Sequence, residues 1–239
     1  TRLDSKYAGV WGTLRTGNDI YITLNLPRIA YESKGNDDKF FEILNRRLEK
    51  MAEILIIKHK IGDNLLHVQS LLKFLSQKFG DEEYYNVMNT TKTFGYTGLT
   101  EAMKYHVGYH LHENKSAQEF GLKIIKRMRE YANECVKNYG LRFSVIASPA
   151  ETCAARLCKL DMAKFGRNVI FSGTKEAPYY TNSHMVKMDA NFPMAEKINI
   201  EQEYHPLTNG GHILHLWLGE SSPSAESLIE LTKKICKKN

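Results

Sequence analysis

The sequence has few cysteines, and no two of them have a metal-binding or redox-active spacing. Its 239 residues include Cys135, Cys153, Cys158 and Cys236, and no pair of these forms a C-x-x-C motif. The spacing therefore indicates neither a zinc site nor a redox dithiol. We expect reduced thiols and no metal ion held by this chain.

Long apolar runs are also missing. None reaches the roughly 18 residues that a membrane-spanning helix needs, and the first residues do not have the charged-then-apolar pattern of a secretory signal. We therefore expect a cytoplasmic protein with no membrane partner.

The sequence contains no Walker-type or dinucleotide-type glycine loop and no recognisable Ser/His/Asp or Cys/His nucleophile motif.

The composition is that of a folded domain with a basic surface. Hydrophobic residues make up 42% and charged residues 25% of the chain, enough for one sizeable core, and we expect no second domain. A net charge of +6 and a pI near 9.0 fit a polyanionic ligand such as a nucleotide. Many basic domains bind no nucleic acid, however, and part of the excess is expected in solvent on the last helix, at Lys233, Lys234, Lys237 and Lys238.

Stretches rich in β-branched and aromatic residues predict strands. One such stretch, residues 20–24, follows a glycine-rich loop and ends before Pro27. Another, residues 142–147, is followed at once by a helix-start signal, so strand, turn and helix form an α/β unit. Shorter strands are expected around Tyr179 and over residues 213–218, and we interpret the glycine-containing stretch 94–96 as a turn.

Apolar residues at three- and four-residue spacing predict helices. From Asp37 they recur in this way up to a break near Gly62. Ser116, with Glu119 three residues later, has the pattern of a capping box. Further helices are expected over residues 65–79, 98–112 and 116–138, directly after residue 148 and after residue 223.

The strongest local signal is the segment SPAET at residues 148–152. We predict that Ser148 caps the helix, with Pro149 at the first helical position and Glu151 completing a capping box. A helix start presents free backbone amides and the positive end of the helix dipole, which suit phosphate groups, and Ser148 and Thr152 could add hydroxyls. A purely structural capping box explains the same residues.

Two further polar segments are candidate binding loops. Gly210 and Gly211, within HPLTNGGH at 205–212, predict a backbone that turns tightly or approaches a ligand closely, although a hairpin turn explains them almost as well. The segment YYTNS at 179–183 could stack on a base or sugar, or pack its tyrosines at a strand end. We expect structural roles, not metal binding, for His106, His110, His112, His205 and His212.

Taken together, five segments resemble anaerobic class III ribonucleotide reductases, the glycyl-radical enzymes that reduce ribonucleoside triphosphates. Each segment is weak alone, but all occur in the family's order over most of the chain. They are TGN with LNLPRIA at 16–30, FGYTGLTEA at 94–102, SPAE at 148–151, YYTNS at 179–183 and HPLTNGGH at 205–212.

The resemblance implies part of a ten-stranded α/β barrel of the glycyl-radical enzyme and ribonucleotide reductase type. Residues 1–239 would form a partial catalytic barrel domain, with a finger-loop remnant at 1–18 and a phosphate-binding strand-helix turn at 142–164. In the family, a thiyl radical removes the 3′ hydrogen of the ribose, and the 2′ hydroxyl leaves as water. The thiyl cysteine is expected just before Thr1, outside this chain.

The resemblance also assigns candidate roles to residues. Asn18 and Glu151 would be catalytic: the Asn18 amide can donate and accept hydrogen bonds near the ribose hydroxyls, and Glu151 would face the active site. Asn25 is the other candidate for the asparagine role. The residues expected to bind substrate are Ser148, Pro149, Ala150, Thr152, Asn25, Asn182, Asn209, Gly210 and Gly211.

Some family features are absent or altered. Ile146 stands where formate-using relatives tend to have tyrosine, which makes a thioredoxin- or glutaredoxin-type reductant plausible. The nucleotide-sensing region, the four-cysteine zinc site and the glycyl-radical loop are missing, so we expect an inactive piece of a longer or split enzyme. The complete enzyme is expected to be a homodimer that binds ATP and other nucleotides and makes deoxyribonucleotides for DNA replication. It is expected to use a glycyl radical, a structural zinc and an iron-sulfur/S-adenosylmethionine activase.

Two other functions are compatible with the residues. One is a non-catalytic nucleotide- or RNA-binding α/β module, suggested by the basic charge and the tyrosines, although no basic and aromatic stripe of the RNA-binding kind is present. The other is a different glycyl-radical enzyme of the same barrel type, acting on another small molecule.

Overall fold

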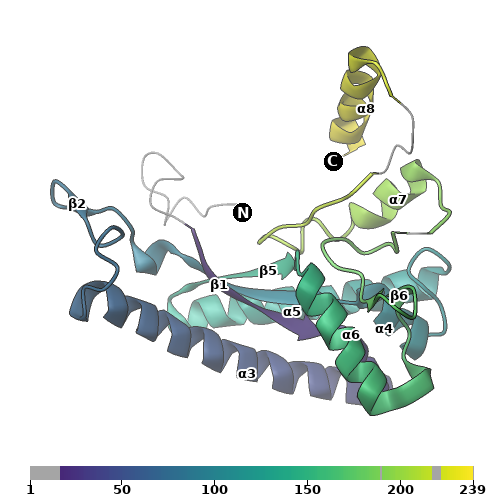
Figure 1. The fold of residues 1–239 in the computed structure, drawn as a ribbon, viewed down its shortest axis with the longest axis horizontal. Coiled ribbons are helices and arrows are strands. Elements are labelled where there is room, and N and C mark those ends of the chain that lie inside the picture. Colours follow the sequence, from purple (N-terminus) through teal and green to yellow (C-terminus); the bar gives the residue numbers. More distant parts are fainter. Residues whose placement is uncertain (1–16, 189, 217–221, 239) are drawn as a thin grey trace.

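The centre of the protein is a sheet of three parallel strands. The computed structural model describes residues 17–188, 190–216 and 222–238. The strand order is β1-β4-β5, with β1 at Asn18–Asn25, β4 at Thr91–Thr97 and β5 at Arg142–Ala147. The strands predicted at 20–24 and 142–147 are confirmed. Because the strands are parallel, their carboxyl ends meet at one edge of the sheet (Figure 1).

The central strand β4 was not predicted, and the expected turn at 94–96 is wrong. Gly95 lies in the middle of this strand, and every residue of β4 is buried. A Cβ on Gly95 would collide with the hydroxyl of Ser148 and stand 3.1 Å from the carbonyl oxygen of Ile22. Glycine here allows close approach within the sheet and does not mark a turn.

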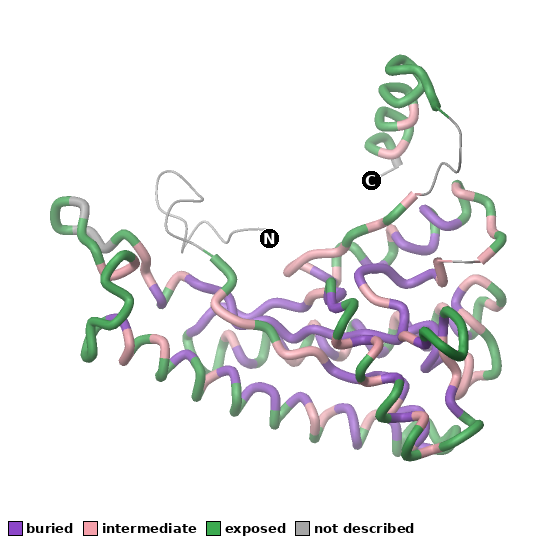
Figure 2. Tube along the Cα trace, viewed as in Figure 1, coloured by how far each residue is buried: buried purple, intermediate pink, exposed green. Residues whose placement is uncertain are grey.

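Two long helices, α3 (Asp37–Asp63) and α5 (Lys115–Tyr139), pack against the sheet. Buried residues of both helices form one core with the apolar side chains of the strands, among them Leu48, Phe94 and Ile125. Along α3 buried and exposed positions alternate, as expected for an amphipathic helix (Figure 2). The helix predicted from Asp37 to near Gly62 is confirmed.

The start of α5 differs from the predicted start. The N-cap of α5 is Asn114, whose side chain accepts hydrogen bonds from the amide of Ser116 (2.8 Å) and from its hydroxyl (2.7 Å). The prediction that Ser116 is the cap is therefore wrong by two residues. The helix ends at Tyr139, one residue beyond the predicted end at 138, and Gly140 closes it at a φ of 65°.

Further short helices depart from the expected boundaries. The unpredicted helix α2 (Leu26–Ser33) follows β1 directly, because Asn25 caps it and proline is tolerated in a first helical turn. The helix α4 (Leu99–His106) ends earlier than the predicted 98–112, and Gly108 follows with a φ of 95°.

The helix predicted over residues 65–79 is wrong. A short π-helix, η1 (Asn64–Val68), stops before Ser70, whose φ of 51° is incompatible with a right-handed helix. A small hairpin of β2 (Lys78–Phe79) and β3 (Glu82–Glu83) follows, and the 3-10 helix η2 (Val87–Asn89) leads into β4.

The carboxyl-terminal half contributes the elements around the end of the sheet. They are α6 (Glu151–Phe165), η3 (Gly166–Asn168), the hairpin β6 (Ser172–Gly173) and β7 (Pro178–Tyr179), α7 (Met194–Glu201) and α8 (Ala225–Lys238). The strand expected near Tyr179 is confirmed. The strand expected at 213–218 is not formed by residues 213–216, and the rest of that range lies outside the described residues.

The last helix, α8, exposes basic side chains to solvent. Lys233, Lys234 and Lys237 are exposed on α8, as predicted, and the side chain of Lys238 lies outside the described part of the chain. Residues 1–16 of the expected finger-loop remnant lie outside the described part of the chain. Among the described helices, none is both long enough and apolar enough to cross a membrane.

Candidate functional site

The turn from β5 into α6 leaves the helix start without a side-chain cap. The predicted capping box is wrong, because α6 begins at Glu151 and its N-cap residue is Ala150, which makes no side-chain cap. Ser148 instead continues the sheet: its amide donates to the carbonyl of Tyr96 (3.1 Å), and its hydroxyl accepts from Thr23 Oγ1 (3.0 Å). The first amides of α6 and the positive end of its dipole are thus left for a ligand.

A pocket of about 500 Å³ lies at this helix start. We call it the helix-start pocket. It combines two residues of β1 with the turn and the first turn of α6: Tyr21, Thr23, Pro149, Ala150, Glu151, Thr152 and Cys153. The structure therefore brings together four residues of the predicted SPAET segment. Sequence analysis missed the two β1 residues, although they share one side of the strand in the two-residue alternation.

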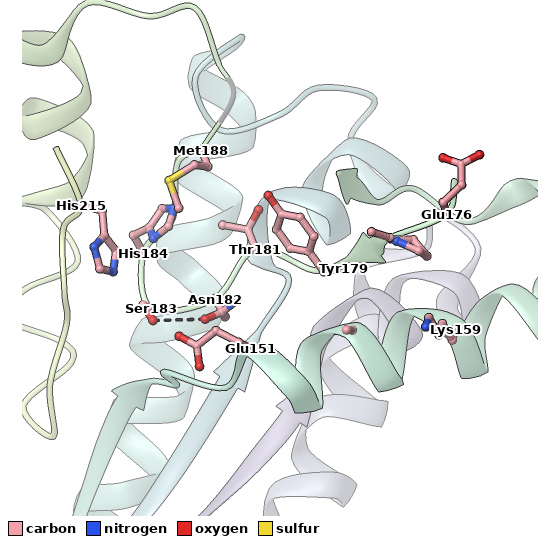
Figure 3. A pocket seen from close by; sticks show the side chains of 13 residues that line it. Glu151, Lys159, Glu176, Tyr179, Thr181, Asn182, Ser183, His184, Met188 and His215 are labelled. Carbon is pink, nitrogen blue, oxygen red and sulfur yellow. Dashed lines mark hydrogen bonds between the residues drawn. The ribbon is translucent and has the colours of Figure 1, made fainter. Parts of the chain in front are cut away.

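A second pocket, of about 450 Å³, shares Glu151 with the helix-start pocket. We call it the side pocket. In Figure 3, Glu151 lies near Asn182 and Ser183, whereas Lys159 lies further along α6. The full lining is Glu151, Ala155, Lys159, Glu176, Ala177, Pro178, Tyr179, Thr181, Asn182, Ser183, His184, Met188 and His215.

The predicted YYTNS segment is tied to the ends of the strands by backbone hydrogen bonds. The amide of Gly98 donates to the carbonyl of Thr181 (2.8 Å), and the amide of Ser183 donates to the carbonyl of Ser148 (2.9 Å). The Asn182 side-chain oxygen accepts from the amide of Ala150 (3.4 Å). This predicted substrate-binding residue therefore lies beside the start of α6.

A buried polar cluster joins Asn25 to α6. Asp161 is fully buried and receives hydrogen bonds from the Asn25 amide (2.8 Å) and the Tyr180 hydroxyl (2.7 Å), together with an ion pair to Arg28 (2.5 Å). Burial raises the pKa of Tyr180 far above its ordinary value. Asn25 lines neither pocket, because its side chain joins α2 to α6, and its binding role stays a prediction.

Asn18 lies at the other end of the sheet from the helix start. It pairs with Thr91 at the beginning of β4. In the amide orientation that satisfies its neighbours, the side-chain nitrogen of Asn18 donates to the carbonyl of Thr91 (3.0 Å). From Asn18 to the carboxyl end of β1 the strand covers roughly 20 Å. The structure thus does not bring the two predicted catalytic residues, Asn18 and Glu151, into one described pocket.

The glycine pair of HPLTNGGH approaches the free edge of β5. The amide of Gly210 donates to the carbonyl of Val145 (2.8 Å), the amide of Ala147 donates to the carbonyl of Gly211 (3.1 Å), and Asn209 Oδ1 accepts from the amide of Val145 (3.0 Å). A Cβ on Gly210 would stand 2.8 Å from that Val145 carbonyl oxygen. The glycines therefore permit close strand contact. The backbone also turns tightly here, because the amide of Gly211 donates to the carbonyl of Thr208 (3.0 Å). The predicted tight turn is therefore confirmed, and the described strands form no hairpin around it.

A buried carboxylate holds this loop to the segment after residue 184. Glu201 of α7 accepts hydrogen bonds from the amides of Met185 (2.9 Å) and Val186 (2.7 Å) and pairs with His212 Nε2 (2.7 Å). Although burial opposes ionisation, these hydrogen bonds hold the pKa of Glu201 below its ordinary value. Sequence reasoning missed this residue, because its partners are distant in the sequence and form no local motif with it.

The described residues include no group of three His, Cys, Asp or Glu side chains that could hold a metal ion. The neighbouring histidines make ordinary polar contacts, such as His106 Nε2 with Asp37 (2.9 Å). Burial raises the pKa of Cys135 to about 11 and that of Cys158 to about 12. Both thiols are therefore protonated at neutral pH and unreactive.

The parallel strands, the uncapped helix start and the two adjoining pockets define an α/β domain with its candidate site at the carboxyl ends of the strands, where such sheets bind ligands. The model of the anaerobic ribonucleoside-triphosphate reductase family matches residues 1–239. The chain belongs to this family of oxidoreductases.

Individual relatives give the same result. The anaerobic ribonucleoside-triphosphate reductase of Escherichia coli (strain K12) is 28% identical over 226 residues, which cover 87% of this chain and 31% of the relative. That of enterobacteria phage T4 is 27% identical over 242 residues, covering 93% of this chain and 38% of the relative. The chain thus spans about a third of the length of the curated relatives it matches.

Solved structures of anaerobic ribonucleotide reductase have the same fold. The Thermotoga maritima enzyme with glycerol in the active site is 27% identical, with a TM-score of 0.82 over 95% of this chain and 36% of that one. Its complex with dATP and CTP is 25% identical, with a TM-score of 0.80 over 94% and 36%. The fold of this chain is part of the α/β barrel of these reductases, and the alternative of a different glycyl-radical enzyme is not supported.

Proposed function

We propose that this chain supplies the substrate-holding part of an anaerobic ribonucleoside-triphosphate reductase, which converts ribonucleotides to 2′-deoxyribonucleotides. The observation that carries the proposal is the uncapped start of α6 beside the helix-start pocket. Backbone amides and a helix dipole at such a position attract phosphate. The chain belongs to the anaerobic ribonucleoside-triphosphate reductase family, and the triphosphate of such a substrate is a ligand that fits this position.

In this proposal, the amides of Thr152 and Cys153 and the hydroxyl of Thr152 receive substrate phosphates. Pro149 and Ala150 shape the turn, and Ser148 fixes it to β1 through Thr23. Glu151, which lines both pockets, faces the reacting part of the nucleotide.

The asparagines and glycines have separate proposed roles. Asn182 and Asn209 hold the two neighbouring segments, and Gly210 and Gly211 keep the second segment close to β5. Asn18 acts near the ribose only if the substrate extends from the turn along β1 toward the amino end of the strand.

The radical chemistry requires parts other than the described residues. We infer that the complete enzyme works in the cytoplasm as a homodimer, in deoxyribonucleotide synthesis for DNA replication, and binds ATP as well as its substrate. Its glycyl radical would be generated by an iron-sulfur/S-adenosylmethionine activase. The complete enzyme would also hold a structural zinc, for which the described residues include no group of three His, Cys, Asp or Glu side chains.

The proposal is tested by removing one phosphate-binding amide without breaking the helix. Thr152→Pro deletes the amide in the first turn of α6, a position where proline is tolerated, as Pro27 is in α2. A charge-assisted hydrogen bond contributes about 1.5–3 kcal/mol, so the Kd for ATP or CTP should rise at least about tenfold. Fluorescence or calorimetric titration of the chain measures this change.

A matched control makes the same substitution at the second residue of another helix. Asp38→Pro in α3 leaves the cap of that helix intact, because Asn36 accepts from the amide of Lys39. It should leave the Kd unchanged. Equal nucleotide affinity of Thr152→Pro and the unaltered chain contradicts the proposal. RNA binding that weakens steeply with salt, together with no nucleotide binding, would instead favour an RNA-binding module.

A further inference from the structure

The side pocket has the character of a small-molecule site. Its volume of about 450 Å³ lies in the range of about 300–1,000 Å³ typical of such sites. Apolar groups such as Ala155, Pro178 and Met188 contribute much of the lining, and a few polar side chains converge on it (Figure 3). This combination suits a flat ring with a polar edge.

His184 is the unusual member of the lining. Its side chain is buried, with 6% of the residue exposed, and neither ring nitrogen has a hydrogen-bond partner among the described residues. A buried polar group without a partner destabilises the folded chain, because it has lost its hydrogen bonds to water. A ligand that hydrogen bonds to this ring would offset that loss.

The imidazole is uncharged at neutral pH. Burial lowers the pKa of His184 to about 4, and although Glu201 favours the charged form, Lys197, His215 and His212 oppose it. A neutral imidazole has one donor and one acceptor nitrogen, and which nitrogen carries the proton follows its partner. Such a group can match either a carbonyl or a ring nitrogen on a heterocycle.

We propose that the side pocket receives the nucleobase of the substrate and that His184 hydrogen bonds to the base edge. The inference rests on the proposed function, because Glu151 joins the side pocket to the helix-start pocket, where the phosphates would bind. One nucleotide can then occupy both pockets. Tyr179, which also lines the side pocket, supplies an aromatic surface for the base.

Because either ring nitrogen of neutral His184 can carry the proton, the side chain can hydrogen bond to bases with different donor and acceptor patterns. A reductase that accepts several bases needs a contact that does not demand one donor and acceptor pattern. We expect His184 to hold the base in place for each substrate and to discriminate weakly among them.

The test compares nucleotides with a ligand that has phosphates but no base. His184→Phe keeps an aromatic ring and removes both ring nitrogens, whereas His184→Gln restores a donor and an acceptor. For the full chain, His184→Phe should raise the Kd for CTP and ATP about fivefold to tenfold and leave the Kd for inorganic tripolyphosphate unchanged. His184→Gln should recover most of the nucleotide affinity.

Two further measurements keep the result interpretable. The histidine ring ¹⁵N resonances of the unaltered chain should shift with CTP and not with tripolyphosphate. His67→Phe, at an exposed histidine of η1 that pairs with Asp63, should bind both ligands normally, and circular dichroism checks that each variant is folded.

The measured affinities distinguish the base assignment from the proposed function. If CTP binds but His184→Phe does not weaken it, or if tripolyphosphate shifts the His184 resonances as CTP does, the base assignment is overturned and the proposed function stands. If neither CTP nor tripolyphosphate binds, both are overturned. Selective loss of nucleotide affinity with rescue by glutamine supports the inference.

Discussion

Replacing Glu201 by glutamine should destabilise the chain by about 2–3 kcal/mol. The carboxylate accepts hydrogen bonds from the amides of Met185 and Val186 and pairs with His212, all at 2.7–3.0 Å. Glutamine has one accepting oxygen, and its NH₂ group would face another donor. At least one charge-assisted bond of about 1.5–3 kcal/mol is then lost, and a buried donor is left unpaired.

Urea unfolding followed by circular dichroism measures this change. The midpoint should fall while the slope stays constant, as expected when stability alone is altered. Glu203→Gln provides the control, because this exposed glutamate is two residues away and loses the same charge. A change below about 0.5 kcal/mol for Glu201→Gln, the usual size for surface substitutions, would refute the reasoning.

Acid gives an independent check on the same carboxylate. The pKa of Glu201 in the folded chain lies below its ordinary value of 4.5. The unfolded chain therefore binds the proton more readily, and the stability due to ionised Glu201 is present above pH 4.5 and lost as pH falls through the folded pKa. The difference between the unaltered chain and Glu201→Gln should shrink over that range. A difference that stays constant contradicts the assignment.

Three other substitutions test the packing around the site. Gly210→Ala should destabilise by about 1–3 kcal/mol, because its Cβ would stand 2.8 Å from the Val145 carbonyl oxygen, whereas Gly17→Ala, with open space around it, should be near neutral in urea unfolding. Asp161→Asn should lower stability by about 3 kcal/mol by breaking a buried ion pair, and an unchanged Tm would count against the cluster. Burial lowers the pKa of Lys92 from 10.5 to about 8, so stability should rise from pH 8 to 10.5 by up to about 3 kcal/mol, and Lys92→Met should abolish that rise.

Strong local patterns in the sequence predicted part of the fold. Three elements were predicted correctly: the helix α3 and the strands β1 and β5. The apolar stripe of α3 and the β-branched residues of the two strands are local patterns that a short stretch of sequence shows. The central strand β4 was missed because its glycine and its lysine break the apolar pattern. Gly95 is required by the neighbouring Ser148, and Lys92 is buried among carbonyl groups such as that of Val87 (3.2 Å). Both reasons are tertiary.

The same limit applies to the candidate site. The SPAET segment was identified from its helix-start chemistry, but its capping pattern was wrong because the hydroxyl of Ser148 is bound by Thr23, 125 residues earlier in the chain. His184 has no local motif, and its importance follows from burial without a partner. Sequence patterns located the segments, whereas the partners of individual side chains depended on how the chain folds.

Three segments that are distant in the sequence meet at the carboxyl edge of the sheet through backbone hydrogen bonds. The carbonyl of Ser148 accepts from the amide of Ser183, and the amide of Gly210 donates to the carbonyl of Val145. Because the main chain makes these connections, the side chains of Glu151 and His184 are not needed to hold the segments together. Substitutions at these two positions should therefore alter ligand binding more than stability, whereas changes at Glu201, which joins two of the segments, should alter both.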